Sequence, residues 1–141
     1  MDVALLGMGY KLGVNPEKWV QEEKMIGRIP YESERKFSAA LCKVNGSVFI
    51  RVKGAVETIL NFCTTVSVNG EIQPIDKEKI LLDAAHLAKD GYRVLAFASG
   101  EYKEYQKRKY IKTKISPHLH FTDLWALSTR YDRKLKKRLK M

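Results

Sequence analysis

Two short stretches of the sequence combine residue types that could hold a nucleotide. IPYESERKFSA contains the aromatic Tyr31 and the cation Lys36, and RVKGAVETIL contains Lys53 beside Gly54. An aromatic ring can stack on a purine, and cations such as these and Arg93 can bind phosphate. Gly54 would let a ligand approach the backbone closely, because glycine carries no Cβ. Ordinary surface charge is the competing explanation, and the residue types alone favour it.

Strand and hairpin signals surround both stretches. KFSAALCKV and SVFIRVKG flank Asn45-Gly46, and TVSVNGEIQPI contains Asn69-Gly70. Asn-Gly between apolar runs is the strongest short hairpin signal, so two hairpins are expected. KMIGRIPYE predicts a short strand at an edge, because Pro30 cannot donate to a sheet. YRVLAFAS predicts a buried strand.

The remaining periodic segments predict helices. DVALLGMGYKLG predicts a helix ending at Gly13, NPEKWVQEE a short helix opened by Asn15, and AVETILNFC another short one. DKEKILLDAAHLAKDGY predicts the longest helix, capped by Asp76 and ended by Gly91. This order predicts an α/β fold of the α+β type, a twisted antiparallel sheet flanked by helices.

The sequence contains no motif that marks a catalytic or metal site. It has no Walker loop, no G-x-S-x-G and no H-E-x-x-H. GMGYKLG belongs to a predicted helix, which argues against a phosphate loop. Cys42 and Cys63 are predicted to be small buried side chains, and His86 to face solvent. His118 and His120 have no third ligand nearby, so no metal site is predicted.

The net charge of +10 comes almost entirely from the end of the chain. Residues 1–100 carry 13 Lys and Arg against 12 Asp and Glu, whereas residues 101–141 carry 13 against 4. The chain is therefore divided into a nearly neutral body, 1–100, and a basic tail, 101–141. A partner inferred from the charge, a nucleic acid or an anionic membrane, would be a partner of the tail alone. That is the alternative function.

Four stretches of the body resemble the nucleotide-binding domain of P-type cation-transporting ATPases. IPYESERKFSA is similar to the family's Pro-Phe-x-Ser-x-Arg-Lys type stretch, and KGAVETILNFC to its Lys-Gly-Ala-x-Glu-x-x-Leu-x-x-Cys. GYRVLAFA contains its Arg-Val-Leu-Ala, and DVALL is similar to its acid-x-Ala-Leu helix. The resemblance covers residues 1–100 and implies an N-domain-like fold.

The resemblance also implies a role for each site residue. Tyr31 falls where the family has the Phe that stacks on adenine, and Asp2 where it has the Glu that holds the adenine amino group. Lys36 and Lys53 match the pocket lysines at the rim and deep inside. Three more positions complete the implied site: Gly54 beside the deep lysine, Arg93 at the phosphates and Leu95 as an apolar wall.

By the same resemblance, the chain is expected to bind ATP, with Mg²⁺ carried by the nucleotide. It lacks the Asp-Lys-Thr-Gly-Thr motif of the phosphorylated aspartate. We therefore expect a cytoplasmic module without catalysis of its own that presents ATP to an aspartate elsewhere in a membrane-embedded pump. The expected partners are the phosphorylation and actuator domains of that pump, with no nucleic acid and no membrane segment in this fragment.

The tail shows no clean period of 2 or 3.6 residues and is expected to be poorly ordered or spuriously helical. Permitted codons of WALSTRYDRKLKKRLKM, read from the third base of each, spell Gly-Phe-Ile-Asp-Pro-Leu-Arg-Gln-Glu-Val-Lys-Glu-Ala-Ile-Lys-Asp. The start resembles the Gly-Phe-Ile-Asp-Pro-x-Arg segment by which the family's chains leave this domain. The hypothesis is a fragment truncated at both ends, with a frame-shifted tail.

Overall fold

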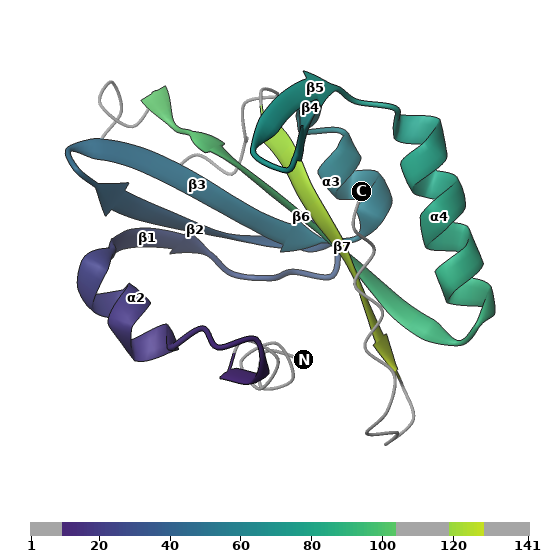
Figure 1. Ribbon diagram of the computed structural model, residues 1–141, viewed down its shortest axis with the longest axis horizontal. Coiled ribbons are helices and arrows are strands. Elements are labelled where there is room, and N and C mark those ends of the chain that lie inside the picture. The colour runs from purple at the N-terminus through teal and green to yellow at the C-terminus, as the bar shows by residue number, and fades with distance from the viewer. Residues whose placement is uncertain (1–9, 104–118, 129–141) are drawn as a thin grey trace.

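The computed structural model describes residues 10–103 and 119–128, which build one seven-stranded sheet with helices packed on it (Figure 1). The helices are α2 (Pro16–Glu22), α3 (Val56–Leu60) and α4 (Lys77–Lys89). The strands are β1 (Lys24–Ile29), β2 (Phe37–Val44), β3 (Ser47–Gly54), β4 (Cys63–Val68), β5 (Glu71–Pro74), β6 (Tyr92–Glu101) and β7 (Leu119–Ser128). Their order across the sheet is β1-β2-β3-β6-β7-β4-β5.

The predicted fold class is confirmed. Apart from the parallel pair β4 and β7, neighbouring strands in the described part of the chain run antiparallel. Helices α3 and α4 lie together at one side of the sheet, whereas α2 lies beside β1 (Figure 1). Within residues 10–103 and 119–128, no helix is long and apolar enough to cross a bilayer.

Both hairpins form where Asn-Gly predicts them. Asn45 and Gly46 have φ of 48° and 86°, and Asn69 and Gly70 have φ of 51° and 85°. Positive φ at both central residues is the two-residue turn whose twist matches that of the flanking strands, and Asn and Gly adopt it most readily. The turns therefore set the strand registers, pairing Val44 with Ser47 in one hairpin.

The helix ends follow their predicted signals. The Asp76 side chain accepts a hydrogen bond of 3.1 Å from the amide of Lys79, and Gly91 adopts a φ of 82° after the last turn of α4. The Asn15 side chain accepts one of 3.0 Å from the amide of Glu17 at the start of α2. These bonds satisfy amides that the first helical turn leaves without a partner.

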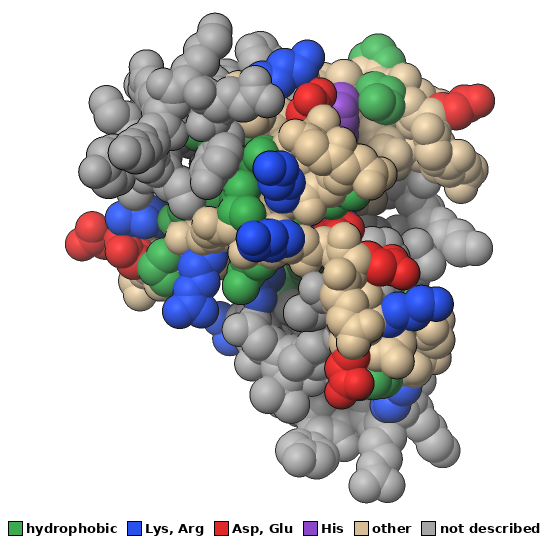
Figure 2. Space-filling model, turned by 90° about the vertical axis from the view of Figure 1, so that its left-hand side faces the viewer, with side chains coloured by type: hydrophobic (Ala, Val, Ile, Leu, Met, Phe, Trp, Pro, Cys, Tyr) green, Lys and Arg blue, Asp and Glu red, His purple; other side chains and the backbone are tan. Residues whose placement is uncertain are grey.

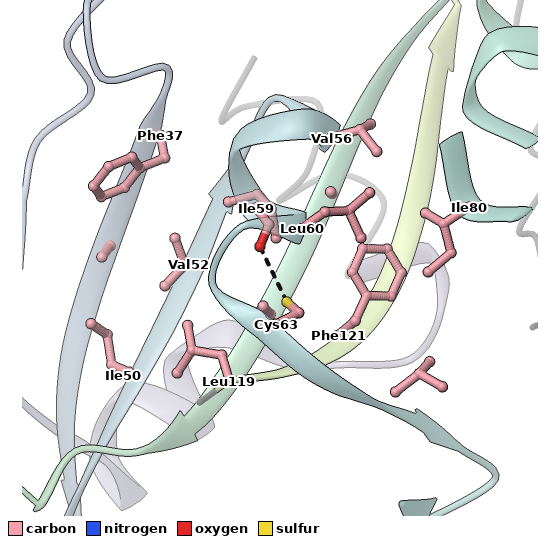
Figure 3. Packing of buried hydrophobic residues seen from close by; sticks show 14 of the residues in the cluster. Phe37, Ile50, Val52, Val56, Ile59, Leu60, Cys63, Ile80, Leu119 and Phe121 are labelled. Atoms are coloured by element: carbon pink, nitrogen blue, oxygen red, sulfur yellow. Dashed lines mark hydrogen bonds between the residues drawn. The ribbon is translucent and has the colours of Figure 1, made fainter. Parts of the chain in front are cut away.

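The hydrophobic core lies between the sheet and the pair α3–α4 (Figure 3). Alternate residues of β3 enter it, as the period of two requires. Ile59 of α3 is fully buried against them, and Ile80 of α4 is 3% exposed. Other buried members include Phe37, Leu41, Ile50, Val52, Val56, Leu60, Ala96, Leu119 and Phe121.

Both cysteines are buried, as predicted. Cys63 lies in the core, where its thiol donates a hydrogen bond of 3.2 Å to the carbonyl oxygen of Ile59 (Figure 3). Burial raises the pKa of the Cys63 thiol to about 12, with a smaller opposite effect from Lys77. The thiolate is therefore strongly disfavoured at neutral pH, and Cys63 acts as a small hydrophobic residue.

One expectation about the basic segment is wrong. We expected residues 101–141 to be irregular or helical, but Leu119–Ser128 form β7, which lies between β6 and β4. Leu119 is 3% exposed and Phe121 is fully buried, so their side chains belong to the core. Because charged residues surround it, this short apolar stretch gave no clear strand signal in the sequence. The division of the chain after residue 100 stays a prediction, and the frame-shift hypothesis concerns residues that lie mainly outside the described ones.

Replacing Phe121 tests whether β7 is part of the folded domain. Because its ring is fully buried, Phe121→Ala should lower the free energy of unfolding by about 3–5 kcal/mol. The neighbouring Thr122 is exposed, so Thr122→Ala should change it by no more than about 0.5 kcal/mol. Urea unfolding measures both. Equal, small effects would show that the strand does not contribute to stability.

Candidate nucleotide site

The connection between β1 and β2 contains Tyr31 and, directly after it, an ordered turn that ends at Lys36. The amides of Arg35 and Lys36 donate hydrogen bonds of 3.1 and 2.8 Å to the carbonyl oxygen of Glu32. The side chains of Arg35 and Glu32 form an ion pair at 3.1 Å. Tyr31 precedes this turn and is 58% exposed, so a large part of its surface is accessible to a ligand.

Lys36 and Gly54 meet through their backbones. Lys36 has a φ of 58°, an unusual conformation for a residue with a side chain. Its carbonyl oxygen accepts a hydrogen bond of 3.0 Å from the amide of Ala55, which directly follows β3. A Cβ on Gly54 would lie 2.3 Å from that oxygen and 2.8 Å from the Cα of Phe37. Glycine is therefore required here for the approach of two backbone segments.

This contact gives Gly54 a structural role, and the role expected for it at the nucleotide stays a prediction. The resemblance implies that the missing side chain leaves room for a purine. In the structure, backbone atoms of Lys36 and Phe37 occupy the position where a Cβ would project. The glycine thus allows the Lys36 turn to pack against the end of β3, next to Lys53.

Lys53, Leu95 and Arg93 share the sheet face opposite the core. Lys53 pairs with Phe97 of β6 and with Ser38 of β2, and cross-strand partners project to the same face. Alternation along β6 places Leu95 and then Arg93 on that face, at steps of about 6.7 Å. Leu95 is 8% exposed, whereas Arg93 is exposed. The face thus offers a sheltered apolar position between two cations.

The seven predicted residues are brought together to different degrees. Lys36, Lys53 and Gly54 are joined at the end of β3, and Leu95 lies on the same face as Lys53. Arg93 lies farther along β6, and Tyr31 stands at the start of the β1–β2 connection. Asp2 lies outside the described residues. Figure 2 shows the face at the left side of Figure 1, where Lys and Arg side chains lie next to hydrophobic ones.

The sequence did not predict the ion pair between Arg51 and Glu23 on this face. Arg51, two residues before Lys53 on β3, forms two hydrogen bonds with the Glu23 carboxylate, at 2.5 and 2.6 Å. Alternation along β3 could have predicted that Arg51 lies on the same face as Lys53. Glu23 gives no comparable signal, because it is 28 residues away in the chain. In the described part of the chain, no group of three or more His, Cys, Asp or Glu could hold a metal ion.

Comparison with known proteins identifies the class of domain. Residues 1–130 match the family model of the P-type ATPase cytoplasmic domain N. The chain belongs to this family. Its α+β sheet with flanking helices agrees with an N-domain-like fold, and nucleotide binding is the general role of such domains.

Particular relatives are cation pumps of which the chain matches a small part. It is 34% identical over 98 residues to the probable cation-transporting ATPase F of Mycobacterium tuberculosis, covering 69% of this chain and 11% of that protein. It is 31% identical over 127 residues to the cation-transporting ATPase pma1 of Synechocystis, covering 89% and 12%. The calcium-transporting ATPase 1 of Bacillus cereus is 29% identical over 104 residues, covering 72% and 12%. The chain thus spans 11–12% of the length of these relatives.

Substitution of Gly54 tests the backbone contact. Gly54→Ala should lower the free energy of unfolding by about 3 kcal/mol, because the added methyl group meets backbone that cannot move aside cheaply. Gly46→Ala is the matched control, since its Cβ would meet nothing within 4 Å and only the φ of 86° is unfavourable. Its cost should be about 1 kcal/mol. Similar losses in the two variants, measured by urea unfolding, would contradict the packing role of Gly54.

Proposed function

We propose that this chain binds an adenine nucleotide on the sheet face opposite its core. The observation that carries the proposal is the Lys36–Ala55 hydrogen bond across Gly54, which ties the turn that follows the exposed Tyr31 to the end of β3, where Lys53 lies. An accessible ring, two lysines and a sheltered apolar side chain suit a purine with phosphates attached. Membership of the N-domain family supports the same ligand.

Each residue then has a distinct part in the proposed site. Tyr31 stacks on the adenine ring, since 58% of its surface is accessible. Leu95 contacts the apolar part of the nucleotide, and Lys53 lies deep on the same face. Arg93 binds phosphate from its exposed position along β6. Asp2 holds the adenine amino group, and Lys36 binds at the rim.

The proposed ligand is ATP, and Mg²⁺ would arrive with its phosphates. The described residues offer cations for the phosphates and an aromatic ring for the base. Within a complete pump, the domain would sit in the cytoplasm and present ATP to the aspartate of a phosphorylation domain, working with an actuator domain. The relatives named as cation-transporting ATPases support this place in a larger protein.

Titration with ATP tests the site. Amide signals of Tyr31, Lys53 and Gly54 should shift at millimolar ATP, because Tyr31 and Lys53 would contact the nucleotide and Gly54 directly follows Lys53. Lys53→Glu should abolish the shifts, since it replaces an attractive charge with a repulsive one beside an anionic ligand. The measurement is a series of amide correlation spectra with increasing ATP.

Lys43→Glu provides the matched control. It makes the same change of charge at an exposed position at the other end of the β2–β3 hairpin. Its shifts should follow those of the unchanged protein. If ATP moves none of the three amides, or if both variants lose binding equally, the proposed site is wrong.

A further inference from the structure

We infer that the basic residues directly after β7 strengthen phosphate binding at the Arg93 end of the proposed site, so that the chain favours ligands with several phosphates over ligands with one. The inference deepens the proposed function and rests on it for the nucleotide. It assigns a role to residues 129–141, which the proposed site does not use. This segment is called the basic terminus below.

The sheet register places the start of the basic terminus beside Arg93. Strands β6 and β7 are antiparallel and pair Arg93 with Leu127 and Tyr92 with Ser128, the last residue of β7. The Cα atoms of directly opposed residues in such a pair are about 4.5–5.5 Å apart. The chain therefore leaves the sheet next to the exposed cation that the proposed site uses for phosphate.

The basic terminus brings a large excess of positive charge to this place. Residues 129–141 contain seven Lys or Arg and one Asp, whereas residues 1–100 contain 13 Lys and Arg against 12 Asp and Glu. In the described part of the chain, Lys89 and Asp90 stand at the end of α4, shortly before Arg93, and their charges are opposite. The net charge that the chain carries to this end of the sheet is thus strongly positive.

Covalent connectivity keeps the first of these charges close to Arg93. The basic terminus lies outside the described residues, so for it we use only residue types and chain length. The Cα of Arg130 lies within about 8 Å of that of Ser128, and the Cα of Arg133 within about 18 Å, because a residue extends the chain by at most 3.6–3.8 Å. The Debye length is about 30 Å at 0.01 M salt. At low ionic strength these cations therefore act on an anion at Arg93 in any conformation.

The electrostatic consequence concerns the number of phosphates. The attraction grows with the charge of the ligand, so ATP gains more from the basic terminus than AMP does. Screening removes the difference at high salt, where the Debye length falls to about 3 Å at 1 M. From the sequence, the charge suggested a nucleic acid or a membrane as partner. The register instead brings it to the end of the sheet at which the proposed site binds phosphate.

The test compares ATP with AMP, without Mg²⁺, after all seven cations are replaced by Gln. At about 10 mM salt the ratio of ATP affinity to AMP affinity should fall roughly fivefold, and at about 0.5 M salt it should match that of the unchanged protein. Amide correlation spectra measure both affinities, and urea unfolding verifies that the variant is folded. The substitutions are Arg130→Gln, Arg133→Gln, Lys134→Gln, Lys136→Gln, Lys137→Gln, Arg138→Gln and Lys140→Gln.

Two controls separate charge and place from other effects. A chain with residues 129–141 in reverse order keeps the charge and should keep the ratio. Lys43→Gln removes an exposed cation beside the Asn45-Gly46 turn, at the end of the sheet away from Arg93, and should leave the ratio unchanged. Three results would overturn the inference: an unchanged ratio in the seven-Gln variant, equal losses of ATP and AMP affinity, and a difference that persists at high salt.

Inorganic tripolyphosphate distinguishes this inference from the proposed function, since it has no base. At low salt it should shift the amide signals of Tyr92 and Arg93, and more weakly in the seven-Gln variant. Those shifts, together with no response of Tyr31, Lys53 and Gly54 to ATP, would refute the adenine site and support the inferred role of the basic terminus. Shifts confined to residues 129–141 would overturn the inference and leave the adenine site standing.

Discussion

The arrangement of the candidate site depends on one backbone hydrogen bond, from the amide of Ala55 to the carbonyl oxygen of Lys36. It joins the end of the β1–β2 connection to the point where β3 turns into α3. The bond can form only because Gly54 has no side chain and because Lys36 accepts a positive φ. An unfavourable backbone conformation is tolerated where surrounding contacts fix it, and such places are often functional. The turn that follows Tyr31 is thereby tied to the strand that carries Lys53.

The sheet divides structural and binding roles between its two faces. Val52 and Gly54 face the core with α3 and α4, whereas Arg51 and Lys53 face the other side. Adjacent residues of β3 therefore serve different purposes. A substitution in β3 can be interpreted by the face that it changes. Changes at Val52 should affect stability first, and changes at Lys53 should affect binding first.

The features predicted from sequence are those that neighbouring residues determine. The Asn45-Gly46 turn, the Asp76 cap and the end of α4 at Gly91 were predictable, because each depends on the conformation of a few adjacent residues. Strand β7 was not predicted, since its pairing with Cys63 and with Ala96 involves partners distant in sequence. The contact of Glu23 with Arg51 was not predicted for the same reason, since the two residues are 28 positions apart in the chain. Residue types had already indicated most of the predicted site, and the family resemblance added Asp2 and Leu95. The packing against Gly54 could be seen only in the three-dimensional structure.

The place of β7 in the sheet affects how the chain can fold during synthesis. Strands β1, β2, β3 and β6 pair with one another directly, whereas β4 and β5 join them only through β7. The parallel pairing of β4 with β7 begins at Cys63 and Leu119, so it cannot start until residue 119 has been synthesised. Closure of such a long loop is slow, and until then one edge of β4 and one edge of β6 lack their partner strand. During synthesis from the amino end, the seven-stranded sheet can therefore form in full only after β7 has left the ribosome.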